Sequence, residues 1–303
     1  MSTHRIALVT ARAARDLDED LPPLIDALRA AGADVAAIDW DDASVDWSEW
    51  DAAVLRSPWD YAQRLPEFLA WAERAAGLTQ LLNPLAVVRW NTDKHYLAEL
   101  ARAGVAVVPS RFVEPGDDAV AALDAFLADF PQAAELVVKP CVGAGSRDAE
   151  RHDRGNTAAA LAHMARLLDT GRSVLLQPYL DRVDAHGETA LLYFDGEFSH
   201  AIRKGPLLQR GEGATRALFA AEHITPRTPT DAERALAERT LAQIPSPRPM
   251  LYARVDLIHD AAGNPCVLEL ELSEPSLFFA HGAKSAERYA AAVLGRAAAV
   301  RTA

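Results

Sequence analysis

Residues 252–276 read YARVDLIHDAAGNPCVLELELSEPS, and this stretch decides the fold of the chain. It contains two strand-like runs, 251–258 and 266–272, on either side of the turn residues 263–265. Glycine and proline between two runs of β-branched residues and leucines are typical of a hairpin. We therefore predict an antiparallel pair of strands near the end of the sequence.

The alternation of residues along these strands collects charge on one face. Successive side chains of a strand point to opposite faces, so Arg254 and Asp256 share one face, as do Glu269 and Glu271. With the turn centred near residues 262 and 263, Asp256 lies opposite Glu269, and Arg254 lies opposite Glu271. The other face is expected to carry three leucines, Leu268, Leu270 and Leu272.

A face with three carboxylates and one guanidinium needs a physical reason, because like charges across a strand pair are destabilising. A divalent cation is the simplest one, since Mg²⁺ prefers carboxylate oxygens and keeps positions open for substrate phosphates. The alternative is an amphipathic hairpin with its charged face in water. The hairpin alone does not exclude that alternative.

The chain has 303 residues, of which 50% are hydrophobic and 24% are charged, which predicts two or three globular domains. Its net charge of -12 gives no general attraction for nucleic acid or an anionic membrane, so we expect neither as a partner. Cys141 and Cys266 form neither a metal-binding spacing nor a disulfide framework. With no secretory leader and no membrane-spanning apolar run, we expect a protein of the reduced cytoplasm.

Strands and helices alternate in the first part of the chain. Strand-like runs cover residues 5–10, 34–40 and 51–57, and helical segments cover 21–31 and 65–76. This alternation predicts a doubly wound parallel sheet. Ligands of such sheets bind beyond the carboxyl ends of the strands.

The segment 56–61, RSPWDY, follows the third of these strands. It offers a guanidinium, a hydroxyl, a carboxylate and two aromatic rings, which are groups that recognise small polar molecules. Arg56 and Ser57 are therefore candidate substrate contacts. A structural loop whose Trp59 and Tyr61 cover the core is an equally good interpretation.

Within residues 87–100, Asn91 or Thr92 can cap a helix that has Lys94 in its first turn and ends at Gly104. A cation there is disfavoured by the helix dipole, so we expect an anionic group beside Lys94. A strand is predicted to follow at 105–112.

A second unit begins with a helix at 119–130 and a strand at 136–140, which leads directly into the glycine-rich residues 141–148, CVGAGSRD. Backbone N–H groups of such a turn can bind phosphate oxygens, and Lys139 stands just before it. The turn lacks the ending of a Walker P-loop and the third glycine of a dinucleotide fingerprint. A plain turn is therefore about as probable from the glycines alone.

Helices and strands are also expected in the rest of the chain. We predict helices at 157–168, 231–243 and 285–299, a strand at 173–180, and a hairpin of strands 187–193 and 197–203. A second glycine-rich segment, 211–214, lies between Arg210 and Arg216 and is a candidate lid.

The chain resembles the ATP-grasp enzymes over essentially its whole length. The resemblance rests on the order of five features: Lys94, Lys139, the 143–146 loop, the 177–180 strand and the charged hairpin. The resemblance implies an α/β and α+β protein. An N-terminal doubly wound domain (residues 1–108) would stand behind two α+β subdomains (109–182 and 183–303) that hold ATP between them.

The resemblance also implies roles for particular residues. Arg254 and Lys204 are the expected catalytic groups, and Asp256, Glu269 and Glu271 are the expected metal ligands. Family members commonly have Asn where this chain has Glu271, so Glu271 either binds metal or pairs with Arg254. The expected ATP-binding residues are Lys94, Lys139, Gly143, Ala144, Gly145, Ser146, Gln177, Pro178, Tyr179, Leu180 and Glu188. The expected substrate contacts are Arg56, Ser57, Glu274 and Ser276.

Four further motifs are RSPWDY, NPLAVVRWNTDKHYL, KGPLLQRGEGATR and LELELSEPSLFF. Through them the chain resembles, within that superfamily, a branch related to prokaryotic glutathione synthetase. The resemblance implies attack of a nitrogen on the activated carboxylate, most readily as the cyclisation of O-ureido-D-serine with release of CO₂ and ammonia. This implies ATP, two Mg²⁺ ions or Mn²⁺, and a small amino-acid-like substrate activated as an acyl phosphate. A homodimer is possible.

Three alternatives stay open. They are a ligase that makes a dipeptide or a glutathione-like amide, a nucleotide-binding module without activity, and a Rossmann dehydrogenase. The missing glycine fingerprint after Thr10 argues against the dehydrogenase.

Overall fold

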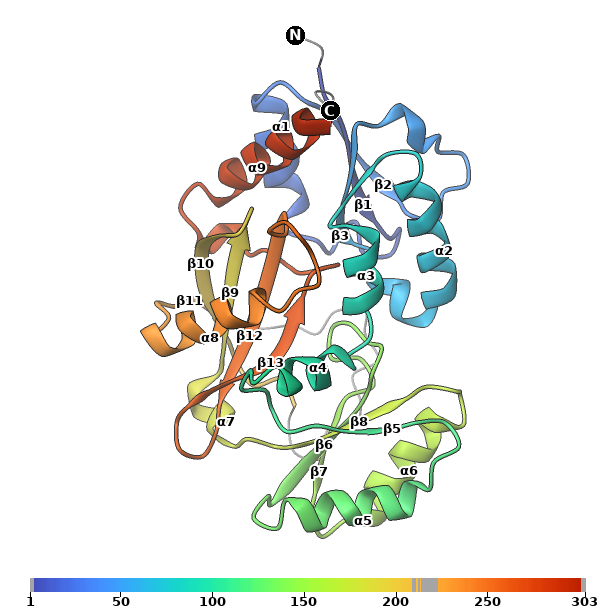
Figure 1. Ribbon diagram of the computed structural model, residues 1–303, viewed down its shortest axis with the longest axis vertical. Helices are drawn as coiled ribbons and strands as arrows, with labels where there is room; N and C mark the ends of the chain where they lie inside the picture. The colour runs from blue at the N-terminus through green and yellow to red at the C-terminus, as the bar shows by residue number, and fades with distance from the viewer. Residues whose placement is uncertain (1–2, 209–210, 212, 214–222, 301–303) are drawn as a thin grey trace.

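The computed structural model describes residues 3–208, 211, 213 and 223–300, which form three sheets and their covering helices (Figure 1). The predicted lid around residues 211–214, with Arg210 and Arg216, lies outside the described residues except for Gly211 and Gly213. None of the helices in the described ranges is both long and apolar enough to cross a membrane.

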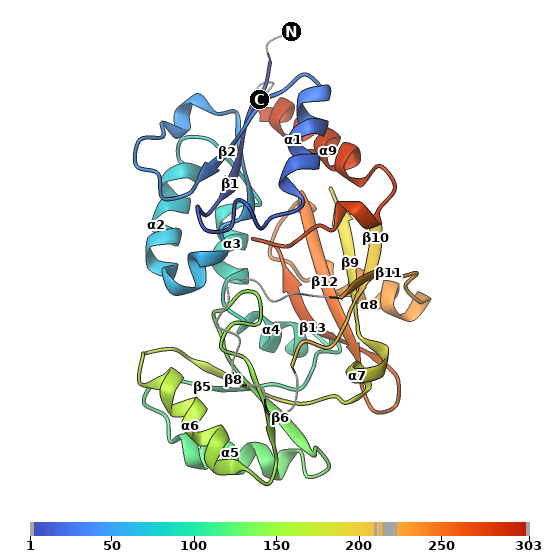
Figure 2. The same ribbon diagram turned by 180° about the vertical axis from the view of Figure 1, so that it is seen from behind.

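Four parallel strands make up the N-terminal sheet, in the order β2-β1-β3-β4. They are β1 (Arg5–Thr10), β2 (Asp34–Asp39), β3 (Ala52–Ser57) and β4 (Gln80–Leu82). Helix α2 (Leu65–Ala76) covers one side, and α1 (Leu21–Ala30) covers the other (Figure 2). The turns η1 (Trp47–Glu49) and η2 (Trp59–Gln63) complete the unit. The predicted doubly wound parallel sheet is confirmed.

The middle sheet is antiparallel, in the order β5-β8-β6-β7. Its strands are β5 (Arg111–Val113), β6 (Glu135–Pro140), β7 (Glu150–Asp153) and β8 (Val174–Pro178). Helices α5 (Ala119–Asp129) and α6 (Thr157–Leu168) pack on it through a core that includes Phe126 and Met164. Their apolar residues recur at helical spacing, which turns one side of each helix toward the sheet.

The C-terminal sheet is antiparallel and has the order β11-β10-β9-β12-β13. Its strands are β9 (Glu188–Phe194), β10 (Glu197–Lys204), β11 (Ile224–Pro226), β12 (Tyr252–His259) and β13 (Pro265–Glu271). The helices around it are α3 (Leu85–Asn91), α4 (Tyr96–Arg102), α7 (Arg182–His186) and α8 (Asp231–Leu241).

The chain returns to its N-terminal part at the end. Helix α9 (Ser285–Val300) follows the turn η3 (Phe279–His281) and packs beside α1 (Figure 1). The Asn83 side chain ties the end of β4 to the hairpin by donating to the carbonyls of Tyr252 and Leu272. Each sheet falls within one of the ranges 1–108, 109–182 and 183–303, and we propose these boundaries for the domains.

The register of the central hairpin agrees with the prediction: Asp256 pairs with Glu269 and Arg254 pairs with Glu271. One prediction about its faces is wrong. Leu257 pairs with Val267, so Leu268 is an extra residue in a β-bulge. A bulge changes the side to which the following residues point. Leu268 therefore lines the cavity described below, instead of the core that contains Leu270 and Leu272.

Two further predictions need correction. The helix expected to begin after Asn91 or Thr92 begins later, as α4, and Lys94 lies in the turn between α3 and α4, where its N–H donates to the Cys141 carbonyl. The strand expected at 105–112 is reduced to a bridge from Val107 to Val267 and to β5. Pro109 interrupts it, because proline has no N–H for a ladder. The polar strand β7 and the short helix α7 were not predicted.

Candidate active site

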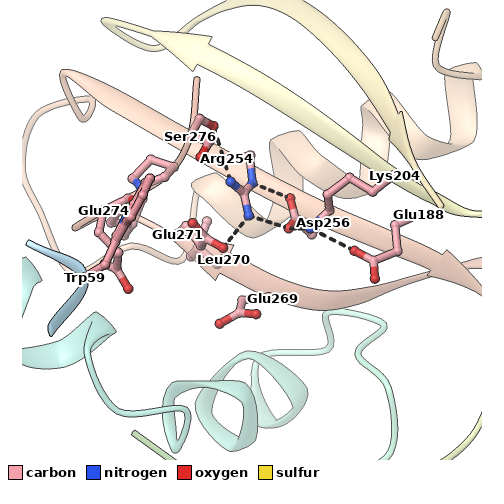
Figure 3. A network of polar contacts seen from close by, with 12 residues as sticks. Trp59, Glu188, Lys204, Arg254, Asp256, Glu269, Leu270, Glu271, Glu274 and Ser276 are labelled. Carbon is pink, nitrogen blue, oxygen red and sulfur yellow. Dashed lines mark hydrogen bonds and ion pairs between the residues drawn. The ribbon is translucent and has the colours of Figure 1, made fainter. Parts of the chain in front are cut away.

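A cavity lies between the middle and C-terminal sheets, and its wall contains every predicted site residue except Arg56, Ser57 and Asp256. Strands β6 and β8 contribute the middle-sheet side. Strands β9, β10, β12 and β13 contribute the other side (Figure 3). Residues as far apart in the sequence as Trp59 and Ser276 thus meet in one cavity.

Two lysines lie beside the glycine-rich loop. The ammonium of Lys94 lies 2.9 Å from Glu269 Oε1 and donates to the Gly143 carbonyl at 2.9 Å. Lys139 also faces the cavity, but its ammonium has no ion pair or hydrogen bond among the described residues. Burial lowers the pKa of Lys139 to about 8, with Glu269 opposing that shift and Lys94 adding to it. An anion in the cavity would satisfy this lysine.

The loop between β6 and β7 carries a backbone conformation suited to a tight turn. Gly145, Ser146 and Asp148 have φ of 60°, 57° and 59°, in the left-handed region. Glycine tolerates this region without a steric cost, whereas serine and aspartate adopt it less often. The loop turns back toward the cavity, and Gly143 to Arg147 form part of its wall.

The charged face of the hairpin forms a connected set of ion pairs (Figure 3). Arg254 holds Asp256 with two hydrogen bonds of 2.8 and 2.9 Å, contacts Glu271, and donates to the Ser276 carbonyl at 3.2 Å. Lys204 lies 2.7 Å from Asp256 Oδ2 and 2.9 Å from Glu188 Oε2. Asp256 is thus held behind the cavity wall by two residues that line the cavity.

The acids of this face differ in their protonation. Burial raises the pKa of Glu271 to about 8, although Arg254 opposes the shift. Burial also acts to raise the pKa of Asp256, but Arg254 and Lys204 outweigh it and hold that pKa at about 2. For Glu269, Lys94 and Lys139 likewise outweigh burial and lower the pKa. The cations of the site therefore keep two of its carboxylates ionised.

The end of the cavity near β8 is apolar. Residues 177–180 line it together with Val108, Ile258 and Leu268. The Gln177 side chain is buried and donates to Ser110 Oγ at 2.9 Å. This end has the character of a site for a flat apolar ring system. The sequence pattern did not identify Val108, Ile258 or Leu268, because single apolar residues look the same in a core and in a cavity wall.

Arg56 and Ser57 are fully buried, outside the cavity wall. The Arg56 guanidinium donates to the Pro275 carbonyl at 3.2 Å and lies 3.6 Å from Asp18. Ser57 Oγ shares a hydrogen bond of 2.8 Å with the Thr10 hydroxyl. In place of the predicted direct contacts, we propose that both residues support the substrate region from behind.

Comparisons with known proteins agree with this architecture. The chain is 44% identical to cycloserine biosynthesis protein DcsG of Streptomyces lavendulae over 295 residues, which is 96% of this chain and 98% of that protein. It is similar to the crystal structure of D-cycloserine synthetase DcsG, with a TM-score of 0.91, 44% identity, and coverage of 97% of this chain and 99% of that chain. Residues 6–83 match the sequence family described as D-cycloserine synthetase DcsG, N-terminal domain.

More distant structures share the fold. D-alanyl-alanine synthetase A from Vibrio cholerae has a TM-score of 0.68 at 13% identity, covering 98% of this chain and 99% of that chain. ATP-grasp ligase PsnB, solved with a minimal precursor, Mg and ADP, has a TM-score of 0.62 at 17% identity, covering 96% and 98%. The fold and site define an ATP-grasp ligase, an enzyme. By its identity to DcsG over nearly its whole length, the chain belongs to the D-cycloserine synthetase family.

Proposed function

We propose that this enzyme closes the ring of D-cycloserine from O-ureido-D-serine at the expense of ATP. The substrate carboxylate attacks the γ-phosphorus of ATP, which forms an acyl phosphate and releases ADP. The nitrogen bonded to oxygen then attacks the acyl carbon, forming the ring C–N bond and releasing phosphate. Water removes the carbamoyl group from that nitrogen as carbamate, which gives CO₂ and ammonia.

One observation carries the nucleotide part of this proposal, namely the ammonium of Lys139 beside the glycine-rich loop, which has no ion pair or hydrogen bond within the described part of the chain. Lys139 is half-buried, and withdrawing a lysine from water without an anionic partner is costly. In this proposal the ATP phosphates supply the partner. The substrate assignment rests on the 44% identity to DcsG. In this proposal the apolar end at residues 177–180 takes the adenine ring.

The donor set of the hairpin fits Mg²⁺, since Glu269 and Glu271 line the cavity and Asp256 pairs with Glu269 across the two strands. These three carboxylates would hold two ions, and Mn²⁺ is expected to substitute. The metal supplies charge neutralisation at the ATP phosphates.

The protein's own contribution is positioning and charge, because phosphoryl transfer needs little covalent chemistry from side chains. Lys94 and Lys139 orient the phosphates, and Arg254 stabilises charge that develops on the transferred group. Lys204 fixes Asp256 and Glu188 in place. A cytoplasmic location and a homodimer stay predictions.

The test is ADP release with ATP and Mg²⁺ across a substrate panel. The panel holds O-ureido-D-serine, its L-enantiomer, γ-glutamylcysteine with glycine, and D-alanine. We expect turnover of the D-ureido compound with a product of the mass of D-cycloserine, and its loss in Lys139→Ala. ADP only with D-alanine or with the glutathione precursors would reassign the enzyme to dipeptide or glutathione-like ligation. ATP binding without ADP from any member would indicate an inactive nucleotide-binding module.

A further inference from the structure

The carboxylates in the cavity wall differ in their partners. Three of them lie against basic side chains: Glu188 against Lys204, Glu269 against Lys94, and Glu271 against Arg254. Glu274 lines the same cavity, but no basic side chain of the described residues lies within 4.0 Å of its carboxylate. Its carboxylate accepts a hydrogen bond from the Tyr61 hydroxyl at 2.5 Å. Glu274 is therefore an acid of the wall that has no ion pair with a basic side chain of the described residues.

The position of Glu274 is fixed by the N-terminal domain. The Trp59 indole N–H donates to the Glu274 carbonyl at 3.0 Å, and Arg56 donates to the carbonyl of Pro275, the next residue. Only 9% of Glu274 is exposed. Holding a carboxylate out of water without a cation is costly, so such a site is prepared for a positively charged ligand group.

A guanidinium binds the backbone two residues after Glu274. Arg254 donates to the carbonyl of Ser276, two residues after Glu274, and both Arg254 and Ser276 line the cavity. In Figure 3 the contacts of Arg254 run to Asp256, Glu271 and Ser276, whereas Glu274 lies beside Trp59. Strand β12 and the segment after β13 thus present a cation and an anion to the same cavity. An α-amino acid carries the complementary pair of charges on adjacent groups.

We propose that Glu274 binds the α-ammonium group of the substrate and makes the enzyme selective for α-amino acids over the same acids without an amino group. This inference rests on the proposed function only in taking the substrate to be an α-amino acid. Tyr61 is a positioning residue, since it holds the Glu274 carboxylate and does not line the cavity. The remaining acids of the wall already have basic partners and are poorer receptors.

The first experiment compares two enzymes and two substrates. The substrates are O-ureido-D-serine and its analogue with hydrogen in place of the α-amino group, and the enzymes are wild type and Glu274→Gln. Glutamine keeps the size of the side chain and an acceptor for Tyr61. We expect Glu274→Gln to raise KM for the amino substrate about 10- to 100-fold, the range of a charge-assisted hydrogen bond, with KM for ATP nearly unchanged. Its kcat/KM for the deaminated analogue should stay within about threefold of wild type.

Two further variants separate charge from packing. Tyr61→Phe keeps the carboxylate and should raise KM for the amino substrate by less than Glu274→Gln does. Glu287→Gln removes the same charge from an exposed position on α9 and should leave KM and kcat/KM for both substrates unchanged. The inference is overturned if Glu274→Gln lowers kcat/KM equally for both substrates, or if it lowers kcat/KM for neither.

A binding measurement keeps this result separate from the proposed reaction. O-ureido-D-serine is titrated calorimetrically into each enzyme with Mg²⁺ and a non-hydrolysable ATP analogue. Binding that Glu274→Gln weakens, without ADP formation by wild type, supports the ammonium site and rejects the reaction. If wild type forms ADP and Glu274→Gln loses kcat/KM equally for both substrates, the reaction is supported and the ammonium site is rejected. No binding and no turnover by wild type reject both.

Discussion

The ammonium of Lys94 lies 2.9 Å from Glu269 Oε1, which joins the turn before α4 to strand β13. The same ammonium donates to the Gly143 carbonyl in the glycine-rich loop. Lys94 is buried, and although burial disfavours its charge, Glu269 raises its pKa above the ordinary value. One side chain therefore connects the loop expected at the phosphates to a carboxylate expected at the metal.

Replacing Lys94 by methionine should impair nucleotide use more than folding. The variant keeps the length of the side chain but loses two charge-assisted hydrogen bonds, so we expect kcat/KM for ATP to fall about 30- to 100-fold or more. Steady-state kinetics at varied ATP measure this. Lys284→Met, at an exposed position, is the control. Values within threefold of wild type would remove Lys94 from the nucleotide site.

Glu269→Gln should change the magnesium dependence of the reaction. Glutamine has the same size but carries no charge, and loss of a direct ligand weakens metal binding at least as much as loss of an outer partner, about 10- to 100-fold. The Mg²⁺ concentration for half-maximal ADP release is the measurement, and EDTA should abolish the rate of wild type. Glu197→Gln, exposed on the same sheet, serves as the comparison. An unchanged Mg²⁺ profile in Glu269→Gln contradicts the ligand assignment.

Asp20 holds the segment that follows the site. Its carboxylate accepts the backbone N–H groups of Leu277, Phe278 and Phe279 at 2.6, 3.0 and 2.9 Å, and it lies 3.7 Å from Arg56. Asp20→Ala leaves buried donors without an acceptor, so we expect a loss of about 3–5 kcal/mol in the free energy of unfolding.

Urea denaturation measures the stability of this variant. Asp20→Asn keeps one acceptor oxygen, so its free energy of unfolding should fall less than that of Asp20→Ala. A loss below about 1 kcal/mol in Asp20→Ala would mean that solvent satisfies these amides.

His163 makes stability depend on pH. Burial lowers its pKa to about 4, with Glu150 opposing the shift, and its ring contacts His152 and the Asp148 carbonyl. The unfolded chain binds the proton with a pKa of about 6.5, so protonation favours unfolding. The contribution of His163 to the free energy of unfolding is therefore complete above pH 6.5. It is lost as the pH falls toward 4, by up to about 3 kcal/mol.

The measurement is the free energy of unfolding at several pH values for wild type and His163→Gln. The difference between the two should shrink as the pH falls, because only wild type carries this titration. His223 is exposed, so the free energy of unfolding of His223→Gln should change with pH in the same way as that of wild type. A difference that stays constant between pH 7 and pH 4 would contradict the assignment.

Local pattern was enough for much of the fold. Helices α2 and α6 have the bounds that their apolar spacing predicts, and the facing of Asp256 and Glu269 follows from strand alternation and the position of the turn. These features depend on residues that lie close together in the sequence, so they can be predicted from it. The grouping of site residues, by contrast, came from the resemblance to ATP-grasp enzymes.

The sequence by itself therefore determined the parallel N-terminal sheet, the charged hairpin and the types of side chain that the site uses. Only the tertiary structure decided their partners. It placed Arg56 behind the wall, turned Leu268 into the cavity through a bulge, and gave Glu274 a hydrogen bond from Tyr61 and no ion pair among the described residues. The physical reason is that burial and charge pairing depend on contacts between residues some two hundred positions apart, such as Tyr61 and Glu274, and no local period encodes them.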